Sequence, residues 1–441
     1  MASSLSRRLQ AAVPSSRIGR LLRISLMAGE MAVGGALHGA RAVASGRRFD
    51  ASRALLSAGN AEVLARRLSK LRGAAMKLGQ MLSIEGDELL PAEFRQALAL
   101  LRSQGFAMPR AQLNRTLGRE LGAGWRTRFA AFEDEPVAAA SIGQVHRAET
   151  HDGRRIALKV QYPGVARSID SDVDNMAALL RWLDFLPVGL DIDALCTEAK
   201  RQLHEEADYL AEATYAERFH DWLASDRDLL VPRVHRDFTT RRVLALDWLD
   251  AEPLETLCRT TTSQALRDRV GERIQGLMFR ELFEFGWMQT DPNPGNYLVE
   301  RASGRLVLLD FGATMRIDPS RAEGYRGICA ALLRGDRDAL ATHAIALGYA
   351  SADEHAASTR QVLELIELVC EPLRTRGRYD FAAHQLPGRA RDLGLELAVQ
   401  GELPAPPAET MFLHRKLAGA FLLCASLRAR VDVRGLVERY V

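Results

Sequence analysis

The sequence predicts an α+β protein with a small antiparallel sheet lobe, a large helical lobe and an N-terminal helical extension. Three observations lead to this prediction. Apolar residues recur at helical spacing in the first part of the chain, short β-type segments cluster in its middle, and the remainder is again mostly helical. A chain of 441 residues is long enough for more than one structural unit. We expect the extension over residues 1–125, the sheet lobe over 126–250 and the helical lobe over 251–441.

Composition and charge are those of an ordinary globular protein. The chain is 47% hydrophobic and 26% charged, with a mean hydropathy of −0.12. Its formal net charge of +3 gives no support to nucleic acid or a strongly acidic substrate as a partner. The cysteines show no Cys-x-x-Cys spacing, which fits a reducing compartment and argues against a disulfide framework or a zinc site. They are Cys196, Cys258, Cys329, Cys370 and Cys424.

The N-terminal segment is basic, because five arginines and no acid precede Glu30. No window reaches the roughly 18 uninterrupted apolar residues that a membrane span needs. The nearest candidate, residues 24–40, is interrupted by Glu30 and His38. Three interpretations stay open: a mitochondrial presequence, an amphipathic segment on anionic lipid, or an ordinary basic helix.

Two helices are expected in the extension. The first follows a cap at Asn60, and its apolar residues recur in steps of three and four. They are Leu64, Leu68, Leu71, Ala75, Leu78 and Leu82. The second covers residues 91–108 and ends at Gly105 and Pro109, which are helix-breaking residue types.

The β-type pattern begins near Phe129. Strands are expected at 144–148 and 155–161, joined by a turn at Asp152-Gly153, which is a strong hairpin signal. A long helix is expected over 193–223 and a further strand at 243–248. Within the helical lobe, strands at 297–299 and 306–309 flank a turn at 303–304.

The most informative motif is Asp291-Pro-Asn-Pro-Gly-Asn296, followed after an apolar strand by Asp310-Phe-Gly. This order and spacing is typical of phosphoryl-transfer sites. Because Mg²⁺ prefers carboxylate and amide oxygens, we expect Asp310 to be the main magnesium ligand and Asn296 the second. Asp291 is placed to orient or deprotonate a hydroxyl group or a water molecule.

Upstream of this motif, Lys159 lies in an apolar strand. Such a lysine either extends to solvent or binds an anion, and the downstream metal motif favours the phosphates of ATP. Its expected partner is a carboxylate of the following helix. Glu205, Asp208 and Glu212 share one face of an ideal helix, so the choice among them stays open at this point.

A glycine-rich phosphate loop is missing before the lysine strand. Its place is taken by a segment with one glycine, which we expect to be stiffer than a glycine-rich loop and to bind the nucleotide through backbone N–H groups. Its residues are Ala138, Ala139, Ala140, Ser141, Ile142 and Gly143. Gln289-Thr290 replaces the His-Arg of protein kinases, and no Ala-Pro-Glu motif follows Gly312. Phosphorylation of protein substrates is therefore disfavoured.

Together these segments resemble the UbiB family of atypical kinases, also called AarF-domain kinases, and most closely its mitochondrial coenzyme Q branch. Lys77-Leu-Gly-Gln80 matches the KxGQ motif, residues 138–144 match the alanine-rich loop, and Glu206-Ala-Asp208 matches the ExD motif. The His414-Arg415-Lys416 segment also resembles the branch. The resemblance covers about residues 13–441 and implies a protein-kinase-like two-lobe fold.

The resemblance also implies roles for single residues. Lys159 and Glu212 would form the nucleotide ion pair, and Asp291 would be the catalytic-loop acid. Lys77 and Gln80 would project from the extension and exclude protein substrates, with Glu206 as the partner of Lys77. The alternative for Lys77 is a solvated basic stripe shared with neighbouring cations of the same helix.

The leading hypothesis is an atypical kinase or ATPase that binds ATP and Mg²⁺ and supports ubiquinone biosynthesis. The expected ligand is a membrane lipid or a prenylphenol-type quinone precursor, and the expected partners are quinone-biosynthesis proteins and a second copy in a homodimer; nucleic acid is not expected. Two alternatives stay open. One is a small-molecule phosphotransferase of the aminoglycoside or choline kinase type, and the other is a nucleotide-gated lipid-binding scaffold without turnover.

The expected location follows from the same resemblance. The chain lacks paired C-terminal spans like those of bacterial UbiB proteins, so membrane attachment is expected to be peripheral. Because the resemblance begins near Val13, we expect little room for a removable presequence. This favours a cytoplasmic bacterial protein, or the mature form of a mitochondrial one.

Overall fold

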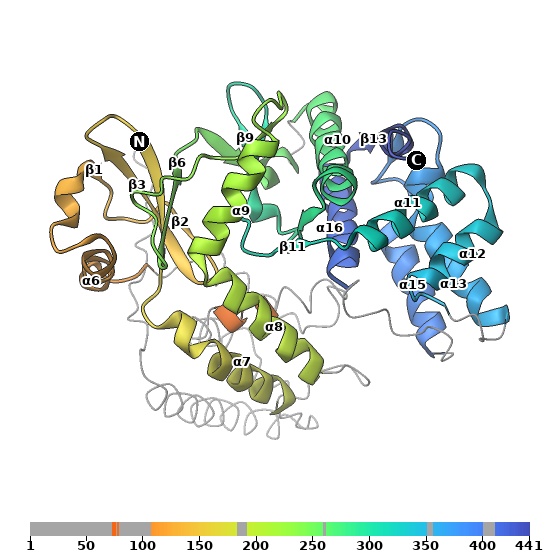
Figure 1. Cartoon of the computed structure of the whole chain (residues 1–441), viewed down its shortest axis with the longest axis horizontal. Helices are drawn as coiled ribbons and strands as arrows, with labels where there is room; N and C mark the ends of the chain where they lie inside the picture. The colour runs from red at the N-terminus through yellow and green to blue at the C-terminus, as the bar shows by residue number, and fades with distance from the viewer. Residues whose placement is uncertain are drawn as a thin grey trace, which may run out of the picture. The chain divides into compact units, whose positions relative to one another are not determined.

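The computed structural model describes residues 73–75, 77–78, 107–182, 192–258, 262–350, 356–399 and 411–441. The chain divides into two units. Of the described residues, the first contains those up to Thr214 together with Arg233–Trp248, and the second contains Tyr215–Pro232 and those from Leu249 to Val441. Figure 1 shows the chain coloured from the N-terminus to the C-terminus, with labels on part of its helices and strands. The predicted division into three parts, at 125 and 250, stays a prediction.

The first unit is built on an antiparallel sheet of five strands, in the order β1-β3-β4-β6 with β2 paired to β3 (Figure 1). The predicted strands and the turn are confirmed to within two residues, and Gly153 has the positive φ of +84° that favours glycine. The strands are β1 (Phe129–Phe132), β2 (Ala138–Ala139), β3 (Gly143–Thr150), β4 (Arg155–Gln161) and β6 (Val243–Asp247).

One face of this sheet packs on a hydrophobic core. Alternate residues of β4 (Ile156, Leu158 and Val160) have no exposed surface, and helix α6 (Arg110–Leu121) contributes Leu113 and Leu117 to the same cluster. Successive side chains of a strand point to opposite faces. The residues between these three in β4 therefore lie on the other face, away from the core.

The prediction of one long helix over 193–223 is wrong. Two helices occupy this region, α8 (Ile192–Glu206) and α9 (Tyr209–Trp222), and α7 (Val165–Trp182) precedes them. The break between α8 and α9 has its own hydrogen bonds. Gln161 Nε2 donates to the Ala207 carbonyl at 2.7 Å, and Asp208 Oδ1 accepts from the backbone N–H groups of Leu210 and Ala211. Asp208 thus caps α9, which satisfies otherwise unpaired N–H groups of its first turn.

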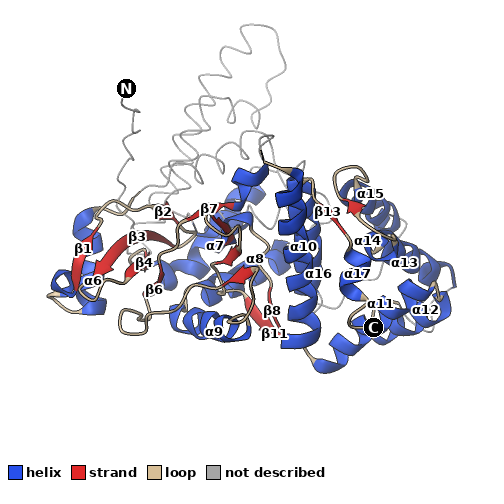
Figure 2. Cartoon of the chain, turned by 90° about the horizontal axis from the view of Figure 1, so that it is seen from above, coloured by secondary structure: helices blue, strands red, loops and turns tan. Residues whose placement is uncertain are grey.

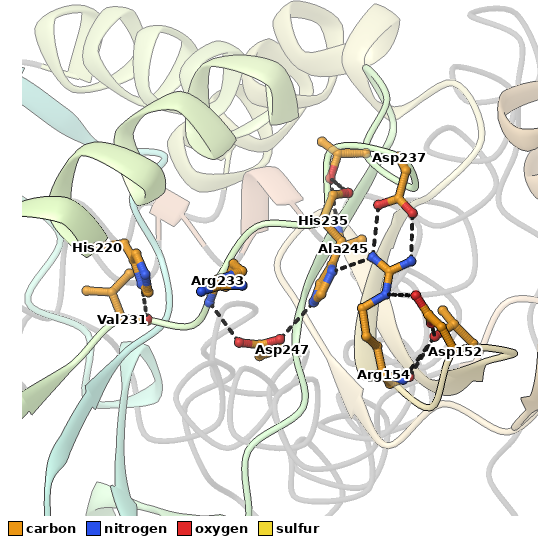
Figure 3. Close-up of polar contacts among 11 residues, drawn as sticks. Asp152, Arg154, His220, Val231, Arg233, His235, Asp237, Ala245 and Asp247 are labelled. Atoms are coloured by element: carbon orange, nitrogen blue, oxygen red, sulfur yellow. Dashed lines mark hydrogen bonds and ion pairs between the residues drawn. The ribbon is translucent and has the colours of Figure 1, made fainter. Parts of the chain in front are cut away.

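A polar network ties the turn after β3 to the chain before β6 (Figure 3). Arg154 donates to the Asp237 carboxylate at 2.9 Å and to His235 Nδ1 at 3.0 Å, while His235 Nε2 lies 2.7 Å from Asp247 Oδ1. Burial raises the pKa of Asp247, but hydrogen bonds from His235 and a backbone N–H outweigh it, so the pKa lies below its usual value. The network therefore connects the β3–β4 turn with β6 and with the segment that precedes it.

The second unit contains a four-stranded sheet in the order β5-β10-β9-β7 and two pairs, β8 with β11 and β12 with β13. The predicted hairpin of β9 and β10 is confirmed, and Gly304 in its turn has φ +70°. The strands are β5 (Leu229–Leu230), β7 (Ala251–Pro253), β8 (Trp287–Gln289), β9 (Tyr297–Glu300), β10 (Leu306–Leu308), β11 (Thr314–Arg316), β12 (Tyr379–Asp380) and β13 (Arg430–Val431).

Helices make up most of the second unit, as predicted, and α10 and α16 lie side by side (Figure 2). A π-helical turn over Glu281–Phe285 ends α10, and Gly286, with φ +64°, leads into β8. The helices are α10 (Gln264–Arg280), α11 (Pro319–Arg334), α12 (Arg337–Ala346), α13 (Ala356–Val369), α14 (Glu371–Arg374), α15 (Leu386–Val399), α16 (Met411–Leu427) and α17 (Val433–Val437).

The predicted extension helices fall mainly outside the described residues. Residues 73–75 and 77–78 of the first are helical, whereas Ala107 and Met108, at the end of the second, are not. No helix within the described ranges is long and apolar enough to cross a bilayer. All five cysteines are free thiols.

Candidate active site

Lys159 and Glu212 form an ion pair in the first unit. Lys159 Nζ lies 2.8 and 3.0 Å from the two carboxylate oxygens of Glu212, on the face of β4 opposite the core. Glu212 is buried in the first turn of α9, where the helix dipole favours a negative charge. Of the three acids left open by the sequence, Glu205 instead pairs with Arg201, and Asp208 caps α9.

The alanine-rich loop forms the tight turn between β2 and β3. The N–H of Ala140 donates to the carbonyl of Gly143 at 2.9 Å. No residue from 138 to 143 has a positive φ, so alanine fits this backbone without strain. A Cβ at Gly143 would lie 2.5 Å from the Val160 carbonyl oxygen. The glycine is therefore required by the close approach of β4.

Lys77 is buried, with 1% of its surface exposed, and its Nζ lies 2.7 Å from Glu206 Oε1. The other oxygen of the same carboxylate accepts a hydrogen bond from Ser141 Oγ at 2.6 Å. The pairing implied by the resemblance is therefore present, and Lys77 does not belong to a solvated stripe. Gln80 lies outside the described residues.

In the second unit, Asn296 and Asp310 flank the same end of the β9–β10 hairpin. Tyr297 pairs with Leu308, and the Asn296 carbonyl accepts from the N–H of Leu309 at 3.0 Å. Asn296 Nδ2 donates to the Asp291 carbonyl at 3.1 Å, which leaves the amide oxygen as the atom suited to a cation. A carboxylate and an amide oxygen at one hairpin end fit the donor preference of Mg²⁺.

The loop that carries Asp291 is held by its own neighbours. Gln289 Nε2 donates to the Asp291 carbonyl at 2.8 Å, and both the N–H and Oγ1 of Thr290 donate to the Ala313 carbonyl. Gln289 and Thr290 stand where protein kinases have His-Arg, and here they fix the loop backbone.

Phe311 secures the segment that follows β10. Its ring is buried, with 1% exposed, and its centroid lies 4.8 Å from that of Phe219. Asp310 Oδ1 accepts from the N–H of Gly312 at 2.9 Å, which fixes one oxygen of the candidate ligand. The Asp-Phe-Gly segment is thus fixed by the buried Phe311 ring and by the hydrogen bond from Gly312 to the Asp310 carboxylate.

Comparison with known proteins identifies the family. Residues 100–344, more than half of the chain, match the sequence profile of the ABC1 atypical kinase-like domain. The chain belongs to the ABC1 atypical kinase-like family. The resemblance found in the motifs is confirmed, since ABC1, UbiB and AarF describe the same group of atypical kinases.

Relatives match the chain over most of its length. "Atypical kinase COQ8B, mitochondrial" of Rattus norvegicus is 37% identical over 97% of this chain and 80% of its own length. "Atypical kinase COQ8, mitochondrial" of Saccharomyces cerevisiae is 34% identical over 97% and 85%, respectively. The solved complex of Rv3197 with erythromycin from Mycobacterium tuberculosis is 26% identical, with a TM-score of 0.60 over 85% of this chain and 93% of that one. The kinase-like two-lobe fold is confirmed.

Helix α16 of this ABC1-family chain contacts the catalytic loop, although no site role was predicted for this helix. Arg415 donates to Asp291 Oδ1 at 3.0 Å, and Lys416 Nζ lies 2.8 Å from Glu281 Oε2. One signal was available in the sequence. Lys416 stands in a mainly apolar helix, and a buried lysine requires an anionic partner.

Gly419 of α16 is predicted to be essential for the catalytic loop to pack. A Cβ at this position would lie 2.1 Å from Pro292 Cβ, which directly follows Asp291. We expect Gly419→Ala to lower the free energy of unfolding by about 2 kcal/mol, since overpacking costs 1–3 kcal/mol, and to lower ATP turnover. Urea unfolding and an ATPase assay measure the two effects.

Gly394→Ala is the matched control. Gly394 also lies inside a helix, α15, but among the described residues no atom outside the backbone of its own helix lies within 4 Å of an added Cβ. Its replacement should leave turnover unchanged and raise stability by about 0.5–1 kcal/mol, because alanine favours the helix over glycine. Equal stability changes in the two variants would contradict a close approach at Pro292.

His414 of α16 is predicted to make stability fall in mild acid. Its Nε2 lies 2.5 Å from the Tyr349 hydroxyl, and burial lowers its pKa to about 4. The unfolded chain has the ordinary pKa of about 6.5, so between these values the unfolded state binds more protons and stability rises with pH. We expect about 2–3 kcal/mol to be lost from this residue between pH 7 and 4.5.

His414→Gln isolates this contribution, because glutamine can hydrogen-bond to Tyr349 but does not titrate. Urea unfolding at several pH values should give a shallower loss of stability for the variant than for the wild type. Parallel pH profiles would show that His414 is not the titrating group.

Proposed function

We propose that this protein is an atypical kinase or ATPase that uses ATP and Mg²⁺ and supports ubiquinone biosynthesis. The proposal is supported by one arrangement of side chains in each unit. The first holds a lysine in a buried ion pair, Lys159 with Glu212, and the second gathers Asn296 and Asp310 at one hairpin end. Both arrangements lie within a chain of the ABC1 atypical kinase-like family.

Each residue has a defined role in this proposal. Lys159, held by Glu212, contacts the α- and β-phosphates, and Asn296 and Asp310 hold the magnesium ion. A bound magnesium ion neutralises charge on the transferred phosphoryl group. Asp291 orients the acceptor, a hydroxyl group or water. The backbone N–H groups of the loop from Ala138 to Gly143 line the phosphates.

One observation carries the choice of an atypical kinase over a small-molecule phosphotransferase of the aminoglycoside or choline kinase type. The buried Lys77–Glu206 pair is hydrogen-bonded to Ser141 of the alanine-rich loop. These hydrogen bonds connect the KxGQ segment to the loop proposed to cover ATP. The phosphotransferase hypothesis gives this connection no role. We assign Lys77 and Gln80 the role of excluding protein substrates.

The acceptor side is proposed from chemistry and family membership. We assign a membrane lipid or a prenylphenol-type quinone precursor as ligand, with quinone-biosynthesis proteins and a second copy of the chain as partners. The names of the rat and yeast relatives both describe a mitochondrial protein. For this chain we propose peripheral attachment to a membrane, on the cytoplasmic side in a bacterium or in the mitochondrion of a eukaryote.

ATP turnover with Mg²⁺, measured with and without anionic liposomes, tests this function. We expect turnover that liposomes increase and EDTA abolishes. Tight ATP binding without turnover would favour a lipid-binding scaffold, and a phosphorylated soluble product would favour a small-molecule phosphotransferase. Normal quinone levels in a strain lacking the gene would reject the role in ubiquinone biosynthesis.

A further inference from the structure

Three successive residues of α16 anchor it to three parts of the second unit. His414 hydrogen-bonds to Tyr349, Arg415 binds Asp291, and Lys416 binds Glu281. His414 and Lys416 lie on either side of Arg415 in sequence, and each has its own partner, the half-buried Tyr349 and the buried Glu281. The backbone of Arg415 is therefore held in place from both sides.

The Arg415–Asp291 contact is an ion pair with little solvent access. Arg415 Nη2 lies 3.0 Å from Asp291 Oδ1, and the two side chains are 12% and 14% exposed. A guanidinium group stays charged at any physiological pH. Hydrogen bonds between charged groups are stronger than neutral ones, so this contact restricts the rotation of the Asp291 carboxylate.

Backbone and side chain of Asp291 are held by different residues. Its carbonyl oxygen accepts from Gln289 Nε2 at 2.8 Å and from Asn296 Nδ2 at 3.1 Å, whereas its carboxylate accepts from Arg415. Loss of Arg415 would therefore leave these contacts of the loop backbone in place and remove a charged contact of the carboxylate. The contact is suited to positioning a side chain whose main chain is already fixed.

We infer that Arg415 is a positioning residue that sets the orientation of the Asp291 carboxylate toward the phosphoryl acceptor. The inference rests on the proposed function, in which Asp291 orients the acceptor. A displacement of about 1 Å at a reacting group costs about a hundred-fold in rate. ATP binding does not depend on this orientation, because the proposed contacts to phosphates and metal come from other residues.

Arg415→Ala tests the inference in the full-length protein. We expect turnover to fall by about a hundred-fold, with the Kd for Mg-ATP within about three-fold of wild type. Guanidinium ion at low millimolar concentration should restore part of the turnover, and Arg415→Lys should retain more than Arg415→Ala. Unchanged turnover, or a loss that guanidinium does not relieve, would overturn the inference. Arg415→Gln replaces the alanine variant if that variant does not fold.

Arg337→Ala is the control. Arg337 forms a two-pronged ion pair with Glu367, with Nε–Oε1 2.8 Å and Nη2–Oε2 3.2 Å, in the same unit and outside the catalytic loop. It should leave turnover unchanged with or without guanidinium. An inactive wild type would reject the proposed function, and a crystal structure of Arg415→Ala would still decide this inference. An Asp291 carboxylate ordered in its original rotamer would reject it.

Discussion

Asp310→Asn is expected to lower ATP turnover by about a thousand-fold, the rate equivalent of about 4 kcal/mol of transition-state stabilisation by a metal ion. Asparagine keeps the oxygen that accepts from the Gly312 N–H at 2.9 Å, so the Asp-Phe-Gly segment retains its local structure. It removes the negative charge that a hard cation requires. Turnover is measured across a Mg²⁺ titration, and ATP binding by calorimetry in the presence of EDTA.

Asp318→Asn provides the matched control for this variant. Asp318 Oδ1 also accepts from the N–H two residues later, that of Ser320 at 2.8 Å, but it caps α11 on the protein surface. This change should leave turnover unaltered. If Asp310→Asn keeps more than about a tenth of wild-type turnover, less than 1.4 kcal/mol comes from its charge, and another residue must be the main ligand.

The sheet of the first unit could be predicted from the sequence, because its signals are local. Alternating apolar residues in 155–161 fix both the ends of β4 and its buried face, and Asp152-Gly153 marks the turn before it. The β9–β10 hairpin has the same kind of signal, an apolar run on each side of a turn glycine. Because Asn296 and Asp310 border those two strands, their placement at one hairpin end followed from the sequence.

The break between α8 and α9 could not be predicted in this way. No glycine or proline lies between Glu206 and Asp208, and helical periodicity continues across the break. The interruption depends on Gln161, 46 residues away in sequence, whose side chain binds the Ala207 carbonyl. Propensity is a weak guide where a tertiary contact competes with the helix. In one continuous helix Asp208 would lie on the same face as Glu212. In the structure Asp208 caps α9 instead.

The contact of Arg415 could not be predicted either, because it too joins residues that are far apart in sequence. Arg415 lies 124 residues from Asp291 in the chain, and no periodic pattern links a C-terminal helix to a loop between two strands. Its contact follows from the packing of α16 beside α10 and from Gly419, which admits Pro292. The resemblance to the family drew attention to the His414-Arg415-Lys416 segment. The partner of each side chain becomes known only from the three-dimensional structure.

Lys416→Met is expected to lower the free energy of unfolding by about 3–5 kcal/mol, the range for breaking one partner of a buried ion pair. Lys416 and Glu281 are 2% and 1% exposed, with Nζ 2.8 Å from Oε2. Burial raises the pKa of Glu281, and the lysine opposes this rise. Without the lysine, a carboxylate remains buried beside Gln289, the last residue of β8, and its desolvation is not compensated. Urea unfolding at pH 7 measures the loss.

A second substitution separates the cost of the isolated charge from the loss of packing. Glu281→Gln combined with Lys416→Met removes both charges and keeps an oxygen for the Gln289 N–H, which binds Glu281 Oε1 at 3.3 Å. Replacing a whole buried pair is often neutral, so the double variant should recover more than half of the stability lost by Lys416→Met.

The single variant should also regain stability as the pH is lowered from 7 to 5. With its folded-state pKa raised further by loss of the lysine, Glu281 binds a proton in the folded state before the unfolded chain does. Equal stabilities of the single and double variants at both pH values would mean that the lysine stem, and not the charge pair, stabilises α16 against the loop.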